Sequence, residues 1–305
     1  MTERRDVTLR GILAAVCTPF TPDGAAVDEE QIATQVDRLV QAGIHGLVPT
    51  GTTGEFTSLS IDEHKSVTEA YVRAAAGRVP VVSGVGALST PKAIELAQHA
   101  EAVGADAIML VPPFYDPLDF PALSRFVRDV AESISIPIVY YNVPGATGIR
   151  LDASQIAELG DIPGVDYLKD TSGDAVELAA LLAGHADRIT AFNGWDTLTF
   201  FGIASGAQAS VWGLAGIAPE QAVALWEALA VRKDLDEART LWPPLWALSA
   251  FLESVNYVAG VKAGLELIGQ PAGPARAPVL ALTQEQRQRL AELLDAVGAR
   301  RGVSA

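Results

Sequence analysis

The stretch IPIVYYNVPGATGIRLDASQIAELGDIPGVDYLK, residues 136–169, decides the fold. Its two ends, Ile136–Tyr141 and Val165–Lys169, are short, apolar and rich in strand-forming residues, which indicates parallel strands buried on both faces. Between them, Asp152–Leu159 carries apolar residues at helical spacing. A strand, a helix and a second strand in this order form one βαβ unit.

The same alternation fills the chain as far as residue 218. Six further strands are expected at Gly11–Cys17, Gly46–Pro49, Val79–Ser83, Ala107–Val111, Ile189–Phe192 and Ala207–Val211. Helical spacing occurs between strands at Asp28–Ala42, Ser60–Ala76, Thr90–Val103, Asp119–Ser133, Asp174–Gly184 and Asp196–Ala204. Eight strands separated by helices favour a closed barrel over an open doubly wound sheet. Gly84 and Gly86 also lack the third glycine that a dinucleotide-binding turn requires.

Beyond the eighth strand the sequence gives no further strand signal. Helices are expected there at Pro219–Val231, Asp234–Leu252, Tyr257–Ile268 and Thr283–Val297. We therefore predict an α/β protein, with a catalytic (β/α)8 TIM barrel over residues 1–218. Residues 219–305 are expected to form a C-terminal helical extension packed on the barrel.

Composition narrows the range of partners. Of the 305 residues, 49% are hydrophobic, and 22 Lys and Arg stand against 37 Asp and Glu, a formal net charge of −15. Such a surface repels nucleic-acid backbones and anionic lipid, so neither is an expected partner, while a small anion can still bind through local donors. No window reaches about 18 consecutive apolar residues, which argues against a membrane span and for a cytoplasmic protein.

Cysteine and histidine give no sign of a metal site. Cys17 is the single cysteine, so we expect no internal disulfide and an inert, buried thiol. His45, His64, His99 and His185 are scattered without metal-binding spacing, and we expect them mostly at the surface or at caps.

Polar residues at strand ends are candidates for catalysis, because the carboxyl ends of barrel strands carry the active site. Lys169 ends one such strand and would point its amine into the barrel mouth. Partial loss of water there favours the neutral amine, which is a nucleophile toward carbonyl groups. A structural ion pair with Asp170 or Asp174 is the alternative, and the lysine alone does not decide between them.

Three further strand ends are polar. Tyr141 could relay protons near that amine, although simple packing is the better interpretation when it is taken alone. The loop GTTGE at residues 51–55 offers backbone N–H groups and two hydroxyls suited to a carboxylate, or it is an ordinary loop before a helix. Asp196 is either a substrate contact or a helix N-cap. No Walker or G-x-S-x-G motif is present, which disfavours nucleotide binding and serine hydrolysis.

Three motifs together carry a family resemblance: GTTGE at 51–55, YNVPGATG at 141–148 and LKDTSGD at 168–174. With them, the sequence from Gly11 into the C-terminal helices resembles the dihydrodipicolinate synthase / N-acetylneuraminate lyase family. The resemblance implies class I, Schiff-base-forming chemistry on pyruvate or a longer 2-oxo acid.

The resemblance also implies a role for each matching residue. Lys169 would form the Schiff base, and Tyr141 would relay protons to the imine and aldol oxygens. Thr53 would bind the carboxylate, and Thr52 would link the relay. Tyr115 matches a tyrosine that in many members crosses a dimer interface to complete that relay.

Other matching positions are implied to bind substrate: Gly51, Thr171, Asp196 and Val211, the last through its main-chain carbonyl. No metal or organic cofactor is needed, because a protonated imine is itself the electron sink. The implied partners are a small 2-oxo acid, an aldehyde and further copies of the chain, assembled as a dimer of dimers.

Departures from the family pattern guide the expected reaction. Ala146 stands where dihydrodipicolinate synthases carry an arginine for the second substrate's carboxylate, and Leu88 and Lys92 stand where lysine-inhibited synthases have Asn and Glu. Thr197 replaces an acidic residue typical of neuraminate lyases. We therefore expect a lyase, a class I aldolase or aldolase/dehydratase acting on pyruvate or a 2-keto-3-deoxy sugar acid-like 2-oxo acid. The alternatives are a 4-hydroxy-tetrahydrodipicolinate synthase, which condenses pyruvate with aspartate semialdehyde, and a non-catalytic 2-oxo-acid-binding protein.

Overall fold

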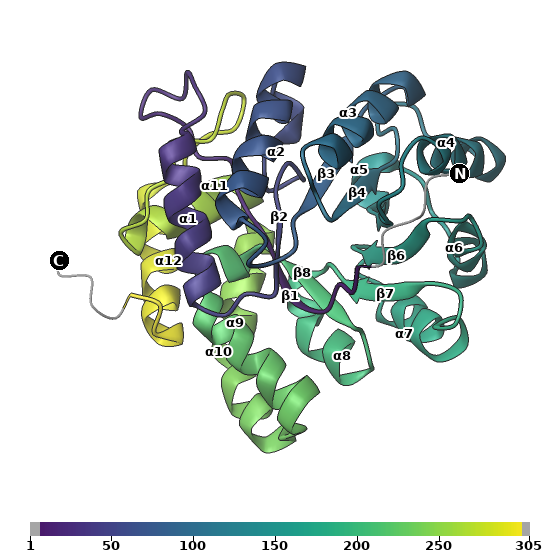
Figure 1. Ribbon diagram of the computed structural model, residues 1–305. Coiled ribbons are helices and arrows are strands. Elements are labelled where there is room, and N and C mark those ends of the chain that lie inside the picture. The colour runs from purple at the N-terminus through teal and green to yellow at the C-terminus, as the bar shows by residue number, and fades with distance from the viewer. Residues whose placement is uncertain (1–6, 301–305) are drawn as a thin grey trace.

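A barrel of eight parallel strands lies at the centre of the molecule (Figure 1). In the computed structural model, which describes residues 7–300, the strands are β1 (Gly11–Ala15), β2 (Gly46–Val48), β3 (Val82–Gly86), β4 (Ala107–Val111), β5 (Ile138–Asn142), β6 (Val165–Asp170), β7 (Thr190–Asn193) and β8 (Ala209–Trp212). Their order is β2-β1-β8-β7-β6-β5-β4-β3, and a parallel bridge between Leu47 and Val81 joins the two ends. The predicted (β/α)8 barrel is confirmed.

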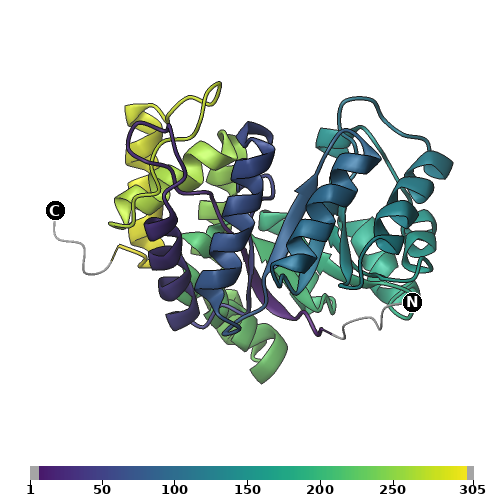
Figure 2. The same ribbon diagram turned by 45° about the horizontal axis from the view of Figure 1, so that its top comes forward.

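Helices surround the strands (Figures 1 and 2). They are α1 (Glu29–Gln41), α2 (Ile61–Ala75), α3 (Thr90–Ala102), α4 (Phe120–Glu132), α5 (Pro144–Thr147), α6 (Ala153–Gly160), α7 (Ala175–Gly184) and α8 (Thr199–Ala204). Four of them follow an aspartate whose carboxylate accepts a hydrogen bond from the first turn: Asp28, Asp119, Asp152 and Asp174. These caps satisfy N–H groups that a helix start leaves without a partner, and they fix where each helix begins.

The strands separate two apolar layers. Successive side chains of a strand point to opposite faces, so Leu13 faces the barrel interior while Ile12 packs beneath the helices. Met109 and Val139 join Leu13 inside. Side chains therefore fill the interior below the mouth, and only the carboxyl ends of the strands remain open for a ligand.

Several predicted boundaries differ from those in the structure, and for two of them the local reason is clear. The strand expected at Val79–Ser83 instead spans Val82–Gly86, because Pro80 has no N–H for a sheet and offers only its carbonyl, to the Leu47 N–H at 2.9 Å. The helix expected from Asp196 begins as a 3-10 turn, η2 (Asp196–Leu198), and becomes α-helical only in α8.

The C-terminal helices lie together on one side of the barrel in both views (Figures 1 and 2). They are α9 (Pro219–Trp226), continued by the π-helical η4 (Glu227–Arg232), then α10 (Leu235–Ser254), α11 (Tyr257–Leu267) and α12 (Gln284–Val297). Leu245 and Leu248 of α10 share one apolar cluster with Ile12 of β1. The division of the chain at residue 218 stays a prediction, and residues 1–6 and 301–305 lie outside the described part.

His64 and Cys17 are both buried, which was expected for the cysteine but not for the histidine. His64 is buried, with Nε2 2.9 Å from the Gly84 carbonyl oxygen, and burial lowers its pKa to about 4. It is a structural residue of the interior rather than a surface or capping residue. Cys17 is buried as expected. Within residues 7–300, no helix is long and apolar enough to cross a membrane, and no His, Cys, Asp and Glu residues form a group that could hold a metal ion.

A buried ion pair ties the C-terminal extension to the loop after β2. Lys262 Nζ of α11 lies 2.6 Å from Glu55 Oε1, and each side chain is only 4% exposed. The Arg276 N–H donates to Glu55 Oε2 at 2.8 Å. Glu55 has a positive φ of 58°, which a non-glycine residue adopts only where its surroundings hold it. The extension thus fixes the conformation of the 51–55 loop.

Lys262→Met should lower the free energy of unfolding by about 3 kcal/mol or more, because Glu55 would stay buried without its cation. Urea denaturation of the purified protein measures this loss. Lys65→Met, which breaks the half-exposed Lys65–Glu95 pair, is the matched control and should cost less than about 1 kcal/mol. Equal losses in the two variants would show that the buried ion pair stabilises the fold no more than the half-exposed pair does.

Candidate active site

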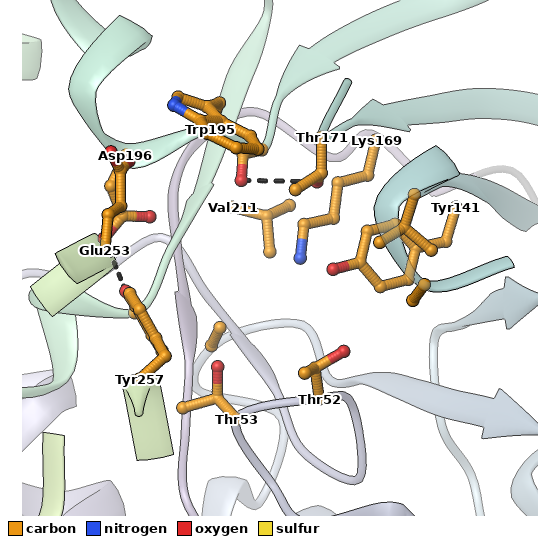
Figure 3. Close-up of a pocket in the computed structure, with 15 residues that line it drawn as sticks. Thr52, Thr53, Tyr141, Lys169, Thr171, Trp195, Asp196, Val211, Glu253 and Tyr257 are labelled. Carbon is orange, nitrogen blue, oxygen red and sulfur yellow. Dashed lines mark hydrogen bonds between the residues drawn. The ribbon is translucent and has the colours of Figure 1, made fainter. Parts of the chain in front are cut away.

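A cavity of about 290 Å³ opens at the carboxyl ends of the strands (Figure 3). Most of the residues singled out from the sequence line it: Thr52, Thr53, Tyr141, Lys169, Thr171, Asp196 and Val211. Gly51 is the first residue of the 51–55 loop and is not among the lining residues; its carbonyl accepts a hydrogen bond from the Phe56 N–H at 3.3 Å. Tyr115 lies outside the cavity and is 88% exposed.

Lys169 is the last residue but one of β6 and points into this cavity (Figure 3). The parallel register pairs Lys169 with Tyr141 on β5, so both side chains leave the sheet on the same face. The Lys169 Nζ lies 4.1 Å from the centroid of the Tyr141 ring, a cation–π distance. The residue as a whole is 6% exposed. A buried amine that rests on an aromatic ring is available to a ligand in the cavity.

The alternative ion pair of Lys169 is not formed. Asp170 instead accepts hydrogen bonds from Asn142 Nδ2 at 2.8 Å and from Ser172 Oγ at 2.9 Å. Asp174 caps α7 by accepting from two backbone N–H groups of its first turn. The two neighbouring carboxylates are thus committed elsewhere, which leaves the amine free of a salt bridge with either.

Gly194 gives the lysine side chain room to cross the barrel mouth. A Cβ added there would lie 2.7 Å from Lys169 Cγ and 2.4 Å from Thr171 Oγ1, closer than real contacts allow. Thr171 Oγ1 donates to the Gly194 carbonyl at 3.3 Å, shown dashed in Figure 3. The glycine after β7 therefore helps to set the path of the Lys169 chain.

The Tyr141 phenol has an altered acidity. Burial alone would raise its pKa, but the positive charge of Lys169 opposes this effect. Hydrogen bonding with Thr52, Lys169 and Thr171 adds to that opposition, and the net pKa of Tyr141 is lowered from its ordinary value. A phenol with a lowered pKa exchanges protons more readily near neutral pH.

The loop that carries Thr52 and Thr53 is held at both sides. Thr18 Oγ1 donates to the Gly54 carbonyl at 2.7 Å, and the Glu55 N–H donates to the Thr52 carbonyl at 3.1 Å. Figure 3 shows Thr52 and Thr53 across the cavity from the Lys169 amine, lower in the view. Two fixed hydroxyls beside a nucleophilic amine suit a 2-oxo acid, whose carboxylate adjoins the carbonyl to be attacked.

Two polar side chains that line the cavity were missed by sequence reasoning, those of Glu253 and Tyr257. The Tyr257 hydroxyl donates to Asp196 Oδ2, and burial raises the pKa of Asp196 to about 7. Asp196 is thus a buried cavity residue, and its carboxylate is not the N-cap that was considered. Glu253 and Tyr257 come from α10 and α11, where the sequence shows only helical periodicity and nothing that points toward the barrel mouth.

Tyr115 is not brought to Lys169 within one chain. Tyr115 lies on the loop after β4. It shares a surface hollow with Leu88, another large apolar side chain, which is 57% exposed. A role for Tyr115 across an interface between two copies stays a prediction.

The comparisons with known proteins agree with this geometry. The sequence model described as the Dihydrodipicolinate synthetase family matches residues 8–297. A 4-hydroxy-tetrahydrodipicolinate synthase of Methanopyrus kandleri is 36% identical over 294 residues, 95% of this chain and 97% of that protein. An uncharacterized DapA-like lyase of Halobacterium salinarum is 37% identical over 288 residues, 94% of either chain.

A solved structure resembles the whole chain. The chloride-inhibited dihydrodipicolinate synthase of Acinetobacter baumannii, complexed with pyruvate, superposes with a TM-score of 0.91 and 32% identity, covering 96% of this chain and 100% of that one. Fold and comparisons together define a lyase of the Schiff-base pyruvate aldolase type. The chain belongs to the Dihydrodipicolinate synthetase family.

Asp196→Asn should become more stable relative to the parent protein as pH rises. The folded-state pKa of Asp196 is about 7, above its ordinary 3.8. Folding therefore favours the protonated carboxyl, and this contribution is full below about pH 4 and lost as pH rises through about 7. Asparagine mimics the protonated form at every pH. Urea denaturation at pH 5 and pH 8 should show the difference shifting toward the variant by more than about 1 kcal/mol. A difference that does not change with pH would contradict the raised pKa.

Proposed function

We propose that the enzyme is a class I aldolase, or aldolase/dehydratase, that binds pyruvate or a related 2-oxo acid as a Schiff base on Lys169. The observation that carries the proposal is the meeting of four groups in one cavity. These are the Lys169 amine, the Tyr141 phenol and the hydroxyls of Thr52 and Thr53. Amine, proton donor and carboxylate cradle are the three parts that imine formation with a 2-oxo acid requires.

The reaction follows from these parts. Lys169 Nζ attacks the ketone carbon, and the resulting carbinolamine loses its oxygen as water to give a protonated imine. A base removes a proton from the adjacent carbon, and the electron pair of that C–H bond moves toward the protonated imine to form the carbon–carbon double bond of an enamine. In the synthetic direction that carbon attacks an aldehyde, and the aldehyde oxygen takes up a proton to become a hydroxyl. Water then hydrolyses the imine and releases the product together with the free amine.

We assign the proton transfers to Tyr141. Its hydroxyl adjoins the Lys169 amine, and its lowered pKa reduces the cost of giving up and regaining a proton. Thr52 interacts with the same phenol and is the proposed link to Tyr115 of a second copy. Thr53, Gly51 and Thr171 complete the proposed 2-oxo-acid subsite, with the Val211 carbonyl facing it.

The proposed natural substrate is a 2-keto-3-deoxy sugar acid or a similar hydroxylated 2-oxo acid. Ala146 lines the cavity, so this wall offers no guanidinium for a second carboxylate. The alternative, a 4-hydroxy-tetrahydrodipicolinate synthase, is favoured by the names of several relatives. A cytoplasmic location and a dimer-of-dimers assembly are part of the same proposal.

A substrate panel separates the two reactions. Pyruvate consumption with hydroxyaldehydes, and pyruvate release from 2-keto-3-deoxy sugar acids, should exceed turnover of pyruvate with aspartate semialdehyde. Lys169→Ala should abolish all turnover and leave the circular dichroism spectrum unchanged, since the variant loses the nucleophile and no salt bridge to Asp170 or Asp174. Efficient turnover of aspartate semialdehyde alone would favour the synthase, and an unfolded Lys169→Ala variant would favour a structural role for the lysine.

Tyr141→Phe should lower kcat about 100-fold or more, because the proton relay is lost while the ring that supports the amine remains. Pyruvate affinity, measured by isothermal titration calorimetry, should change far less. A loss of affinity as large as the loss in kcat would point to a binding role for the hydroxyl instead.

A further inference from the structure

The side of the cavity away from Tyr141 carries two carboxyl groups (Figure 3). Asp196 comes from the turn after β7, and Glu253 comes from the last turn of α10. Of the described residues that line the cavity, only Lys169 is cationic. A second substrate that enters this side of the cavity while Lys169 holds the first would meet these two carboxyl groups.

Glu253 is held in place by residue 197. The Thr197 N–H donates to Glu253 Oε1 at 2.9 Å, and the Thr197 hydroxyl donates to Oε2 at 2.9 Å. The Asp196 N–H and the Trp195 side chain also hydrogen-bond to this carboxylate, so its position beside the cavity is fixed by several donors of the turn after β7. Thr197 stands where neuraminate lyases carry an acidic side chain, and here the acidic group is supplied from a different helix and is held by that threonine.

The position of Glu253 is not explained by helix stability. The carboxyl end of a helix carries partial negative charge and is stabilised by cations, whereas Glu253 places an anion in the last turn of α10. Its hydrogen bonds to Thr197 help to hold η2 in place. That role does not require a negative charge, because the neutral amide oxygen of a glutamine could accept from the same N–H. The negative charge itself faces the cavity and its ligand.

The charge balance of the cavity then restricts the second substrate. The protonated imine is neutralised by the adjoining carboxylate of the bound 2-oxo acid. A second carboxylate, on the aldehyde, would face Glu253 without a cation nearby, since position 146 is alanine. Like charges at close range repel, so a carboxylate on the aldehyde is disfavoured beside Glu253, whereas a neutral, hydroxyl-bearing aldehyde meets no such repulsion.

We propose that Glu253 is a specificity residue that selects neutral, hydroxyl-bearing aldehydes and rejects aldehydes that carry a carboxylate. This inference rests on the proposed aldolase function and adds to it the residue that sets acceptor choice. It places that choice in the C-terminal extension, outside the strands that carry the imine chemistry.

The test uses Glu253→Gln, which keeps an acceptor for the Thr197 N–H and removes the charge. The value of kcat/KM is measured with pyruvate and either glyceraldehyde or succinic semialdehyde, a carboxylate-bearing aldehyde. Pyruvate affinity is measured separately by isothermal titration calorimetry. Glu266→Gln on α11, whose carboxylate pairs with Arg287 outside the cavity, is the matched control. Glu253→Lys extends the series by reversing the charge.

The parent protein should prefer glyceraldehyde. Glu253→Gln should raise its kcat/KM for succinic semialdehyde about tenfold, change that for glyceraldehyde far less, and leave pyruvate affinity unchanged. Glu253→Lys should shift the ratio further in the same direction, and Glu266→Gln should not shift it. An unchanged ratio in both Glu253 variants, with intact pyruvate binding, would overturn this inference alone. Failure of the parent protein to bind pyruvate would remove the proposed function and the inference with it.

Discussion

The approach of the Lys169 amine to the Tyr141 ring is the interaction on which the site depends. It follows from the backbone, because the parallel register of β5 and β6 places the two residues side by side on one face of the sheet. Both residues stand near the carboxyl ends of their strands, where packed side chains give way to the cavity. Barrel closure and strand register thus bring nucleophile and proton donor together before any loop is considered.

The surrounding structure keeps that amine free for chemistry. Asp170 and Asp174 are occupied by other hydrogen bonds, and Gly194 leaves room for the lysine chain. The C-terminal extension contributes from two sides: Lys262 anchors the loop of the two threonines through Glu55, and α10 brings Glu253 to the cavity. The extension is therefore a working part of the site as well as a cover for the barrel.

The sequence predicted the fold and much of the cavity, because both follow from short-range patterns. Apolar strands, helical spacing and the polar residues at strand ends suffice to place Lys169, Tyr141 and the 51–55 loop at one mouth. The start of β3 was mispredicted because Pro80 interrupts an apolar run that reads as one strand. His64 was expected at the surface, but it is buried and its ring lies within hydrogen-bond distance of the Gly84 carbonyl oxygen, a long-range contact that the sequence does not reveal. Glu253 and Tyr257 were missed because the path of the chain after β8, which no local pattern encodes, brings them to the cavity.

Borohydride reduction in the presence of pyruvate, followed by peptide mass spectrometry, tests the central claim most directly. If the amine forms an imine, reduction leaves one 1-carboxyethyl group on the peptide that contains Lys169, and the same treatment without pyruvate leaves that peptide unchanged. Lack of any adduct, or an adduct on another lysine such as Lys65 or Lys262, would contradict the account.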